Sequence, residues 1–435
     1  MGLLPKKITL NLSQEVAPMN RIAIIGAGIS GLSAAQILRK KHSVTVFDRA
    51  SKPGGLVKCD RIRDNLFHRV GGHVFNSRNQ EVLDWFWSFF ERDKEFIKAR
   101  RNAKILFNGK LIGYPIENYL HQLDKEFVSS VLDDFLSSDY QPRSPFSYPN
   151  FADFLKSNFG KTLYEAYFRP YNEKIWNTNL ENIPLQWLDG KLPMPDLKSM
   201  LLSNIVVQEE TEMVHATFYY AKEGGSQFIA NRLAEGLDIR LNTEITGVSK
   251  TEAGYFLAGE GPFDKIVFTG DVRQAAAVFP DSQTALKAGD YLRNLPSKGT
   301  SNIFCETDPG DVSWLYLPGI ETKAHRIIYT GTFAESNNRG SERHTCVVEF
   351  SGEYSFEFMT EEIKKLPGNL VPIDWNHEPN SYILHNHETA SLLKEFNQNF
   401  AAEGIYLLGR FAEWEYYNMD KAIEAAMKLD REINS

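Results

Sequence analysis

Three glycines and one acid near the start of the chain have the types and spacing of a dinucleotide-binding site. Gly26, Gly28 and Gly31 form a Gly-x-Gly-x-x-Gly motif, and Asp48 follows it. In such a motif the first glycine permits a tight turn, the second leaves room for a pyrophosphate against the backbone, and the third lets a helix pack closely on a strand. The acid is placed to accept a hydrogen bond from a ribose hydroxyl. We therefore predict a dinucleotide site here.

The residues around these glycines predict the elements that position them. Residues 22–25 are apolar, as in a buried parallel strand, and residues 44–47 predict a second strand that delivers Asp48. Between them, residues 31–40 predict a helix whose N-terminus faces the phosphates, with Ser30 as a further cofactor contact. This order of elements makes the motif more specific than three glycines alone, although a plain glycine-rich turn between a strand and a helix is the structural alternative.

A second pair of glycines indicates which dinucleotide is bound. Gly54, Gly55 and Leu56 follow the acid in the sequence SKPGGL. This segment resembles the extended FAD signature of flavoproteins of the amine-oxidase and protoporphyrinogen-oxidase type, in which the chain doubles back along the cofactor. The resemblance implies FAD, with NAD as the alternative.

Two adjacent glycines, Gly71 and Gly72, directly precede His73. Adjacent glycines give a backbone freedom that a regular strand does not need, which favours close approach to a flat ligand with the histidine beside it. A β-bulge that carries a hydrogen-bonded core histidine fits the same residues equally well.

Several ordered segments resemble one family, the UDP-galactopyranose mutases. VGGHVFNS, at 70–77, is similar to the histidine loop of that family, in which the histidine lies beside the flavin ring. The stretch RPYNEKIW resembles the eukaryotic-type branch more than the bacterial one. The remaining matches follow in the order of the family, at residues 107–118, 168–176, 186–191, 314–327 and 404–420.

The resemblance implies an isomerase that interconverts UDP-galactopyranose and UDP-galactofuranose without net redox change. In the family, N5 of reduced FAD attacks the anomeric carbon and displaces UDP, and the flavin–sugar adduct opens and recloses as the other ring form. FAD is then active in its reduced form, NAD(P)H is a candidate reductant, and a nucleotide-sugar is the substrate.

By the same resemblance, His73, Arg169 and Arg326 are the catalytic residues, and the two arginines bind the substrate diphosphate, which suits a planar guanidinium. An interdomain salt bridge for Arg169 and a solvent-facing position for Arg326 are the structural alternatives. The resemblance gives further substrate contacts at Tyr114, Asn150, Phe154, Tyr171, Asn172, Trp176, Tyr382 and Tyr416. It gives further cofactor contacts at Val248, Gly409, Arg410, Asn418 and Met419, before a helix predicted over 421–428 whose N-terminus opposes negative charge on a reduced ring.

Three departures from the family pattern favour keeping other functions open. Phe333 stands where the family has a tyrosine, the segment 379–385 keeps only its tyrosine, and Asn418 replaces the acid common in bacterial members. If the missing hydroxyl contacts a phosphate, the substrate would differ. The main alternative is an FAD-dependent oxidoreductase of the amine-oxidase or protoporphyrinogen-oxidase type, and the second is a non-catalytic FAD- or nucleotide-sugar-binding protein.

Composition indicates the class of protein and the compartment in which this chemistry would take place. The chain has 435 residues, 42% of them hydrophobic and 24% charged, which is typical of a globular protein. A net charge of −8 argues against a general nucleic-acid surface, and no apolar run is long enough to span a membrane. The three cysteines are far apart in sequence and none lies in a CxxC motif, which favours a reducing compartment, so we expect a cytoplasmic protein. The oligomeric state stays open.

These patterns predict an α/β fold: a Rossmann-like FAD-binding domain with an inserted helical domain and an antiparallel β-sheet substrate domain. Residues 80–100 and 117–200 have a helical pattern, and 301–350 alternate as antiparallel strands do. Residues 1–18 predict a weakly attached extension, with Met19 as an alternative start. The remaining boundaries are 19–100, 216–275 and 396–435 for the FAD-binding domain, 101–215 for a strand segment with the helical insertion, and 276–395 for the substrate domain.

Overall fold

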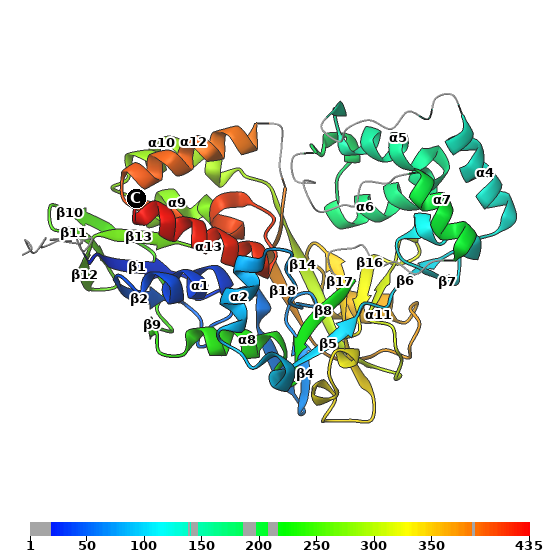
Figure 1. Ribbon diagram of the computed structural model, residues 1–435, viewed down its shortest axis with the longest axis horizontal. Coiled ribbons are helices and arrows are strands. Elements are labelled where there is room, and N and C mark those ends of the chain that lie inside the picture. Colours follow the sequence, from blue (N-terminus) through cyan, green and yellow to red (C-terminus); the bar gives the residue numbers. More distant parts are fainter. Residues whose placement is uncertain (1–18, 138–139, 141–146, 186–196, 208–215, 385–387) are drawn as a thin grey trace, which may run out of the picture.

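A five-stranded parallel sheet carries the glycine motif at its centre, in the strand order β19-β13-β1-β2-β9. The strands predicted over 22–25 and 44–47 are confirmed as parts of β1 and β2, which pair in parallel register. Helix α1 (Ile29–Leu38) packs against α13 (Met419–Ile433), and the two lie side by side along the sheet in Figure 1. The bounds are β1 Arg21–Ile25, β2 Ser43–Phe47, β9 Asp238–Arg240, β13 Lys265–Phe268 and β19 Ile405–Leu407.

This computed structural model describes residues 19–137, 140, 147–185, 197–207, 216–384 and 388–435. The predicted extension over 1–18 and the family-like stretch at 186–191 lie outside the described residues.

A seven-stranded sheet forms the second large sheet of the molecule, with the strand order β18-β14-β17-β16-β15-β6-β7. Its pairs are antiparallel, as expected for 301–350, except that β15 and β6 pair in parallel. The parallel pair arises because β6 and β7 arrive from a much earlier part of the chain and not through a hairpin. The bounds are β6 Ala103–Phe107, β7 Lys110–Gly113, β14 Ser297–Thr307, β15 Trp314–Tyr316, β16 Ala324–Ile328, β17 His344–Ser351 and β18 Val371–Ile383.

The helical prediction for 80–100 is correct only in its first part. Helices α2 (Gln80–Trp87) and α3 (Arg92–Glu95) form, but β5 (Phe96–Arg100) pairs with β8 (Thr217–Ala221). Pairing with a distant strand decides the conformation of this segment, and local pattern cannot show such a partner. Two further small sheets consist of β3 Cys59–Ile62 with β4 Asn65–His68, and of β10 Ser249–Thr251, β11 Gly254–Leu257 and β12 Glu260–Phe263.

The helices of the middle of the chain gather at one end of the molecule, near β6 and β7 and away from α1 and α13 (Figure 1). Their core is aromatic, with rings from several helices packed together. Their bounds are α4 Lys125–Leu136, α5 Phe151–Leu163, a π-turn at Tyr164–Phe168, α6 Arg169–Trp176 and α7 Leu197–Val206. The other helices are α8 Gly225–Ala234, α9 Ala275–Val278, α10 Gln283–Arg293, α11 Phe356–Ile363 and α12 Thr389–Ala402.

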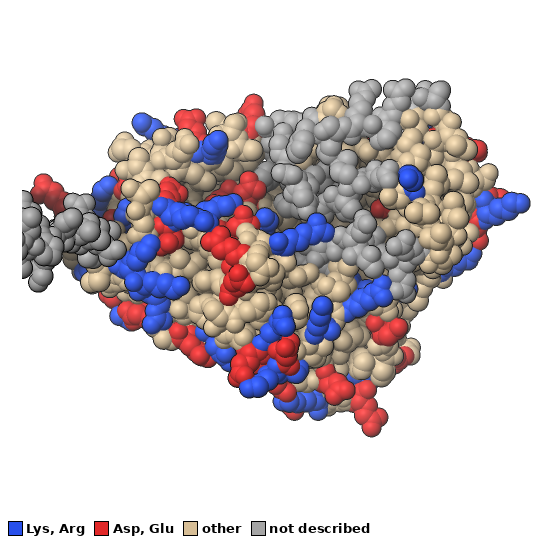
Figure 2. Space-filling view, viewed as in Figure 1, with Lys and Arg blue, Asp and Glu red and all other residues tan. Residues whose placement is uncertain are grey.

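Surface charge and cysteines follow the composition. On the face in Figure 2, basic and acidic side chains are interspersed over the described residues. None of the described helices combines the length and the apolar character that crossing a bilayer requires. Cys59, Cys305 and Cys346 are free and buried, and the last two stand opposite each other on β14 and β17.

Replacing Gly31 by alanine should destabilise the parallel-sheet domain. A Cβ at this position would lie 1.9 Å from the carbonyl oxygen of Gly26, so the helix and the turn would have to separate. We expect Gly31→Ala to lower the free energy of unfolding by about 3 kcal/mol, measured by urea denaturation. Gly247→Ala, where no atom lies within 4 Å of the new Cβ, is the control and should change it by less than about 0.5 kcal/mol. Equal stability of the two variants would contradict the close packing.

Candidate active site

A cavity of about 560 Å³ lies where the carboxyl ends of the parallel strands meet the seven-stranded sheet. Gly28 and Asp48 line it from the parallel-sheet side, and Arg326 and Tyr382 line it from the other sheet. Open α/β sheets bind ligands at this edge. The predicted residues that line the cavity are Gly26, Gly28, Ser30, Asp48, Gly54, Gly55, Leu56, Gly72, His73, Arg326, Tyr382, Arg410, Tyr416, Asn418 and Met419.

The two glycine turns pack backbone against backbone. The Gly54 N–H donates to the Ala27 carbonyl at 2.8 Å, and a Cβ on Gly55 would lie 3.1 Å from the Gly28 Cα. No side chain caps the N-terminus of α1. Backbone N–H groups of its first turn are therefore available to an anion that enters between the turns.

Asp48 braces the first glycine turn as well as lining the cavity. Its carboxylate accepts the N–H of Ala27 at 2.6 Å and the N–H of Ala50 at 2.8 Å. Each carboxylate oxygen has a second lone pair, so a ribose hydroxyl can still donate to it. The predicted ribose contact is compatible with this geometry and stays a prediction.

The arrangement fits the FAD that the resemblance implies. The close approach of Gly28 and Gly55 leaves backbone in place of side chains on either side of the turn. The α1 N-terminus suits a pyrophosphate and Asp48 suits a ribose, while α13 begins at Met419 beside the same cavity. The helix predicted over 421–428 is confirmed as part of α13. These residues would hold the dinucleotide along the cavity.

On the side of the seven-stranded sheet, the buried carboxylate of Glu349 on β17 contacts several of the residues that line the cavity. Its Oε1 accepts the Gly71 N–H at 2.9 Å, and its Oε2 accepts a hydrogen bond from the Arg326 Nε. His325 Nε2 lies 3.5 Å from the same Oε2. Burial alone would raise the pKa of the Glu349 carboxyl, but Arg326 and His325 hold that pKa well below its ordinary value. Glu349 is therefore ionised and fixes Arg326 and the histidine loop together.

Arg326 presents the rest of its guanidinium to the cavity. One terminal nitrogen donates to the Tyr382 hydroxyl at 3.2 Å. Tyr382 stacks on Tyr416 with ring centres 6.1 Å apart and planes at 17°. A guanidinium held on one side by a carboxylate and open on the other is suited to a diphosphate.

His73 lines the cavity in its neutral form. Burial, then the charge of Arg410, lowers the pKa of His73 to about 4, and its Nε2 has no hydrogen-bond partner within the described part of the chain. Gly72 before it is required by packing, since a Cβ there would lie 2.5 Å from Ile328 Cγ2. His73 therefore lines the cavity as a neutral residue whose buried Nε2 has no hydrogen-bond partner among the described residues.

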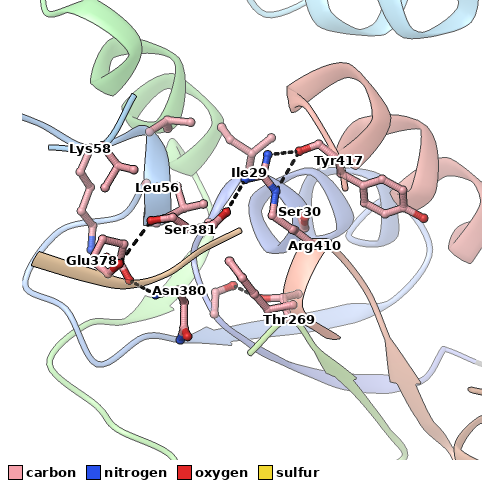
Figure 3. Close-up of a pocket in the computed structure, with 18 of the residues that line it drawn as sticks. Ile29, Ser30, Leu56, Lys58, Thr269, Glu378, Asn380, Ser381, Arg410 and Tyr417 are labelled. Carbon is pink, nitrogen blue, oxygen red and sulfur yellow. Dashed lines mark hydrogen bonds between the residues drawn. The ribbon is translucent and has the colours of Figure 1, made fainter. Parts of the chain in front are cut away.

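Arg410 joins the two sheets at the cavity. It donates to the Tyr417 carbonyl at 3.2 Å and 2.6 Å and to the Ser381 carbonyl at 3.0 Å, as Figure 3 shows. Its guanidinium lies 4.5 Å from the centre of the Tyr416 ring. Arg410 thus holds the turn before α13 against β18.

The structure does not bring Arg169 to the cavity. The residue begins α6 directly after the π-turn, so the predicted helix irregularity is present. Its guanidinium pairs with Glu165 at 2.6 Å and is 47% exposed. The salt bridge that forms is not the interdomain one of the structural alternative, because Glu165 belongs to the same helical segment. Binding of a diphosphate by Arg169 stays a prediction.

Three other residues predicted to contact substrate have structural roles inside the helical segment. The Asn150 side chain caps α5 by accepting the Asp153 N–H at 2.9 Å. Phe154 is buried in the aromatic core of these helices, and Asn172 donates to the Phe168 carbonyl at 2.7 Å. Helix capping and core packing explain these residues without a ligand.

Tyr114, Tyr171 and Trp176 form a layer behind the cavity wall. Tyr114 and Tyr171 pack on Tyr316, with ring centres 4.5 Å and 5.7 Å apart, and Trp176 packs on Tyr382 at 5.8 Å. They support rings that line the cavity and do not line it themselves.

Three predicted cofactor contacts are also packing positions. Gly31 packs on the first glycine turn, and a Cβ at Gly409 would lie 2.5 Å from Ser30 Oγ. The Val248 N–H already donates to the Val278 carbonyl at 2.7 Å, and Val278 lines the cavity in its place.

Sequence reasoning missed a further arginine that lines the cavity, Arg101. Its guanidinium lies 5.0 Å from the ring centre of Trp314 and 5.3 Å from that of Tyr114, and it bonds to the Tyr316 hydroxyl. The Arg101 Nε is buried and has no partner among the described residues. The two β15 rings that contact Arg101, Trp314 and Tyr316, could be seen in the sequence. The residues next to Arg101 in the sequence, however, gave no sign that this arginine was different from one on the surface. Lys58 and Glu378, which also line the cavity and are labelled in Figure 3, were likewise not predicted.

Phe333 stands at a position where the family resemblance gives a tyrosine. Phe333 is buried below Gly72, with its ring centre 4.9 Å from that of Trp314, and it does not line the cavity. A change of substrate through the missing hydroxyl therefore stays a prediction.

Comparison with known proteins supports the fold and the family resemblance. Residues 24–90 match the family model of the NAD(P)-binding Rossmann-like domain. The UDP-galactopyranose mutase of Mycoplasma pneumoniae is 27% identical over 93% of this chain and 94% of its own length. A Klebsiella pneumoniae protein named "Probable UDP-galactopyranose mutase" is 28% identical over 40% of this chain, and that match spans 45% of the relative. A crystal structure of reduced UDP-galactopyranose mutase is similar in fold, with 19% identity, 96% of this chain and 94% of that chain covered, and a TM-score of 0.83. The predicted resemblance and the predicted fold class are both confirmed.

Removing the charge of Glu349 should destabilise the cavity wall. In Glu349→Gln the Arg326 guanidinium keeps its position but loses its buried counterion, which costs about 3 kcal/mol. We expect this loss in urea unfolding at neutral pH. Glu378→Gln, another carboxyl that lines the cavity, is the control and should cost less than about 1 kcal/mol. A Glu349→Gln protein as stable as wild type would show that Glu349 does not organise the site.

Proposed function

We propose that this protein is a flavin-dependent mutase that interconverts the pyranose and furanose forms of a UDP-sugar, with UDP-galactose as the first candidate. One observation carries the proposal: a cavity that joins a double glycine turn to a carboxylate-held arginine, in a chain similar to a named mutase over 93% of its length.

The residues of the chain divide the work along the cavity. The glycine turns and the α1 N-terminus bind the cofactor pyrophosphate, and Asp48 orients its ribose. Reduced FAD, when bound, supplies a nucleophilic ring nitrogen for the sugar. Arg326 binds the diphosphate and offsets the charge that grows on the leaving UDP, while Tyr382 and Tyr416 close over the phosphates.

His73 contributes as a neutral group. With its pKa near 4 it carries no charge at neutral pH, so its free Nε2 can accept or donate a hydrogen bond without repelling Arg326 or Arg410. A hydrogen-bonding group at this position would suit the edge of a bound flavin. NAD(P)H as the reductant and a cytoplasmic location complete the proposal.

The charges of the cavity favour the mutase over an FAD oxidoreductase of the amine-oxidase type. Such an oxidase needs a largely apolar pocket, whereas both basic and acidic side chains line this one, and Arg101 and Arg326 are among the basic ones. A UDP-sugar requires basic groups for its diphosphate.

Exchanging Arg326 for lysine tests the diphosphate site. Arg326→Lys keeps a positive charge beside Glu349 but loses the planar fork, so we expect UDP to bind about tenfold more weakly and turnover to fall, with FAD retained. Calorimetric titration with UDP measures the affinity, and flavin absorbance measures the cofactor. Arg343→Lys, a conservative change outside the cavity, is the control. Loss of FAD with unchanged UDP affinity would refute the assigned role.

Arg169 is tested separately because the structure places it away from the cavity. If it binds the diphosphate, as the family resemblance implies, Arg169→Ala weakens UDP binding and turnover while FAD stays bound. Glu165→Ala, which removes only the ion-pair partner, is the matched control and should leave UDP affinity within about twofold. Unchanged UDP affinity in Arg169→Ala would leave Arg326 and Arg101 as the cations that hold the diphosphate.

A further inference from the structure

The turn between β19 and α13 contains a carboxyl group for which the proposed chemistry has no use. Glu413 lies in a π-turn at Arg410–Trp414. Its Oε2 accepts the Gly409 N–H at 2.6 Å, and its Oε1 accepts the Tyr417 hydroxyl at 3.2 Å. The side chain therefore links Gly409, directly before Arg410–Trp414, to Tyr417, which follows this segment.

One of the two residues that Glu413 holds lines the cavity, and the other contacts a residue that lines it. Tyr417 lines it, and its carbonyl receives the Arg410 guanidinium that also bonds to β18. Figure 3 shows Arg410 between Tyr417 and Ser381. Gly409 lies against Ser30 of the first glycine turn. Glu413 thus contacts Tyr417, which lines the cavity. Through Gly409 it is also connected to Ser30, which lines the cavity as well.

In the part of the chain that the structure describes, no basic group pairs with this carboxyl. Among the described residues Glu413 takes part in no salt bridge, and Glu415 on the same turn is acidic. Lys428 of α13 lowers the pKa of Glu413 without forming an ion pair with it. The ammonium group of Lys428 is paired instead with Glu424 at 2.9 Å. Burial, with Glu415 adding to it, raises the pKa of Glu413 to about 7, against the opposing hydrogen bonds from Gly409 and Tyr417.

We propose that Glu413 is a proton-binding positioning residue, which holds the turn carrying Arg410 and Tyr417 and takes up a proton when the bound cofactor is reduced. The inference rests on the FAD of the proposed function but not on the mutase reaction. Under this proposal the titration of Glu413 makes the midpoint potential of the bound flavin depend on pH.

The electrostatic reason is the appearance of a second negative charge in the same region. Two electrons from dithionite and one proton from solvent convert the oxidised ring to a reduced ring that bears a negative charge. That charge disfavours ionised Glu413, so the carboxylate binds a second proton from solvent and becomes neutral. No other bond changes. Near and above pH 7, reduction is therefore accompanied by more than one proton.

The test is the midpoint potential of the bound flavin between pH 6 and 9, in wild type and in Glu413→Gln. Glutamine keeps an acceptor for the Gly409 N–H and a donor for the Tyr417 hydroxyl, but it cannot titrate. We expect the wild-type potential to fall more steeply with pH, corresponding to an extra uptake of up to one proton per two electrons. Titration of the flavin ring itself is common to both proteins and cancels in the difference.

Glu415→Gln is the matched control. It removes a negative charge from the same turn without touching the Gly409–Tyr417 closure, so the extra proton uptake should persist at a slightly lower pH. Identical slopes in wild type and Glu413→Gln would overturn the proposal. Since the potential needs only bound FAD, a protein that shows the difference yet converts no UDP-sugar would refute the mutase and leave this inference standing.

Unfolding gives a second measurement if Glu413→Gln binds FAD poorly. A carboxyl with a raised pKa in the folded state contributes stability below its unfolded pKa that is lost as pH rises toward 7. The free energy of unfolding of wild type should therefore fall relative to Glu413→Gln between about pH 4.5 and 7. The same pH dependence in both proteins would show that no titrating carboxyl is buried there and would overturn the proposal.

Discussion

The buried carboxylate of Glu349 is the constraint on which the substrate side of the cavity depends. A charge in this position is costly unless hydrogen-bond donors and cations surround it. Glu349 therefore fixes the register of β16 beside β17, where Arg326 stands directly opposite it. The same carboxylate receives the Gly71 N–H, so the loop that carries His73 cannot move without leaving the charge unsatisfied.

The cofactor side is organised by close backbone packing in place of charge. The glycine turns contact each other through backbone atoms, with 3.1 Å between a Cβ on Gly55 and the Gly28 Cα. A Cβ on Gly31 would lie 1.9 Å from the Gly26 carbonyl oxygen, and one on Gly409 would lie 2.5 Å from Ser30 Oγ, so neither fits. This packing leaves N–H groups and a helix N-terminus in the space that side chains would otherwise fill. Arg410 then links the two sides, because it bonds both to the turn before α13 and to β18. A cavity shaped in this way is suited to a long, flat, anionic ligand beside a second anion, as the proposed function requires.

The sequence predicted those parts of the site whose chemistry is local. Strand, turn, helix and acid from residue 22 to residue 48 follow one another within a single unit, so spacing alone was sufficient. Arg326, Tyr382 and Tyr416 were found through family resemblance. Glu349 and Arg101 were not found, because their roles depend on strand register and on aromatic rings that come from distant parts of the chain. The same limit explains the error at 96–100, where a partner strand more than a hundred residues away decides the conformation.

The most direct measurement is sugar conversion by the purified yellow protein, with and without reduction. UDP-galactofuranose is added under anaerobic conditions to protein treated or not treated with dithionite, and UDP-galactopyranose is followed by chromatography. The proposed function predicts conversion only by the reduced protein. No conversion by the reduced protein, with UDP causing no change in the flavin spectrum, would contradict it and favour an FAD oxidoreductase.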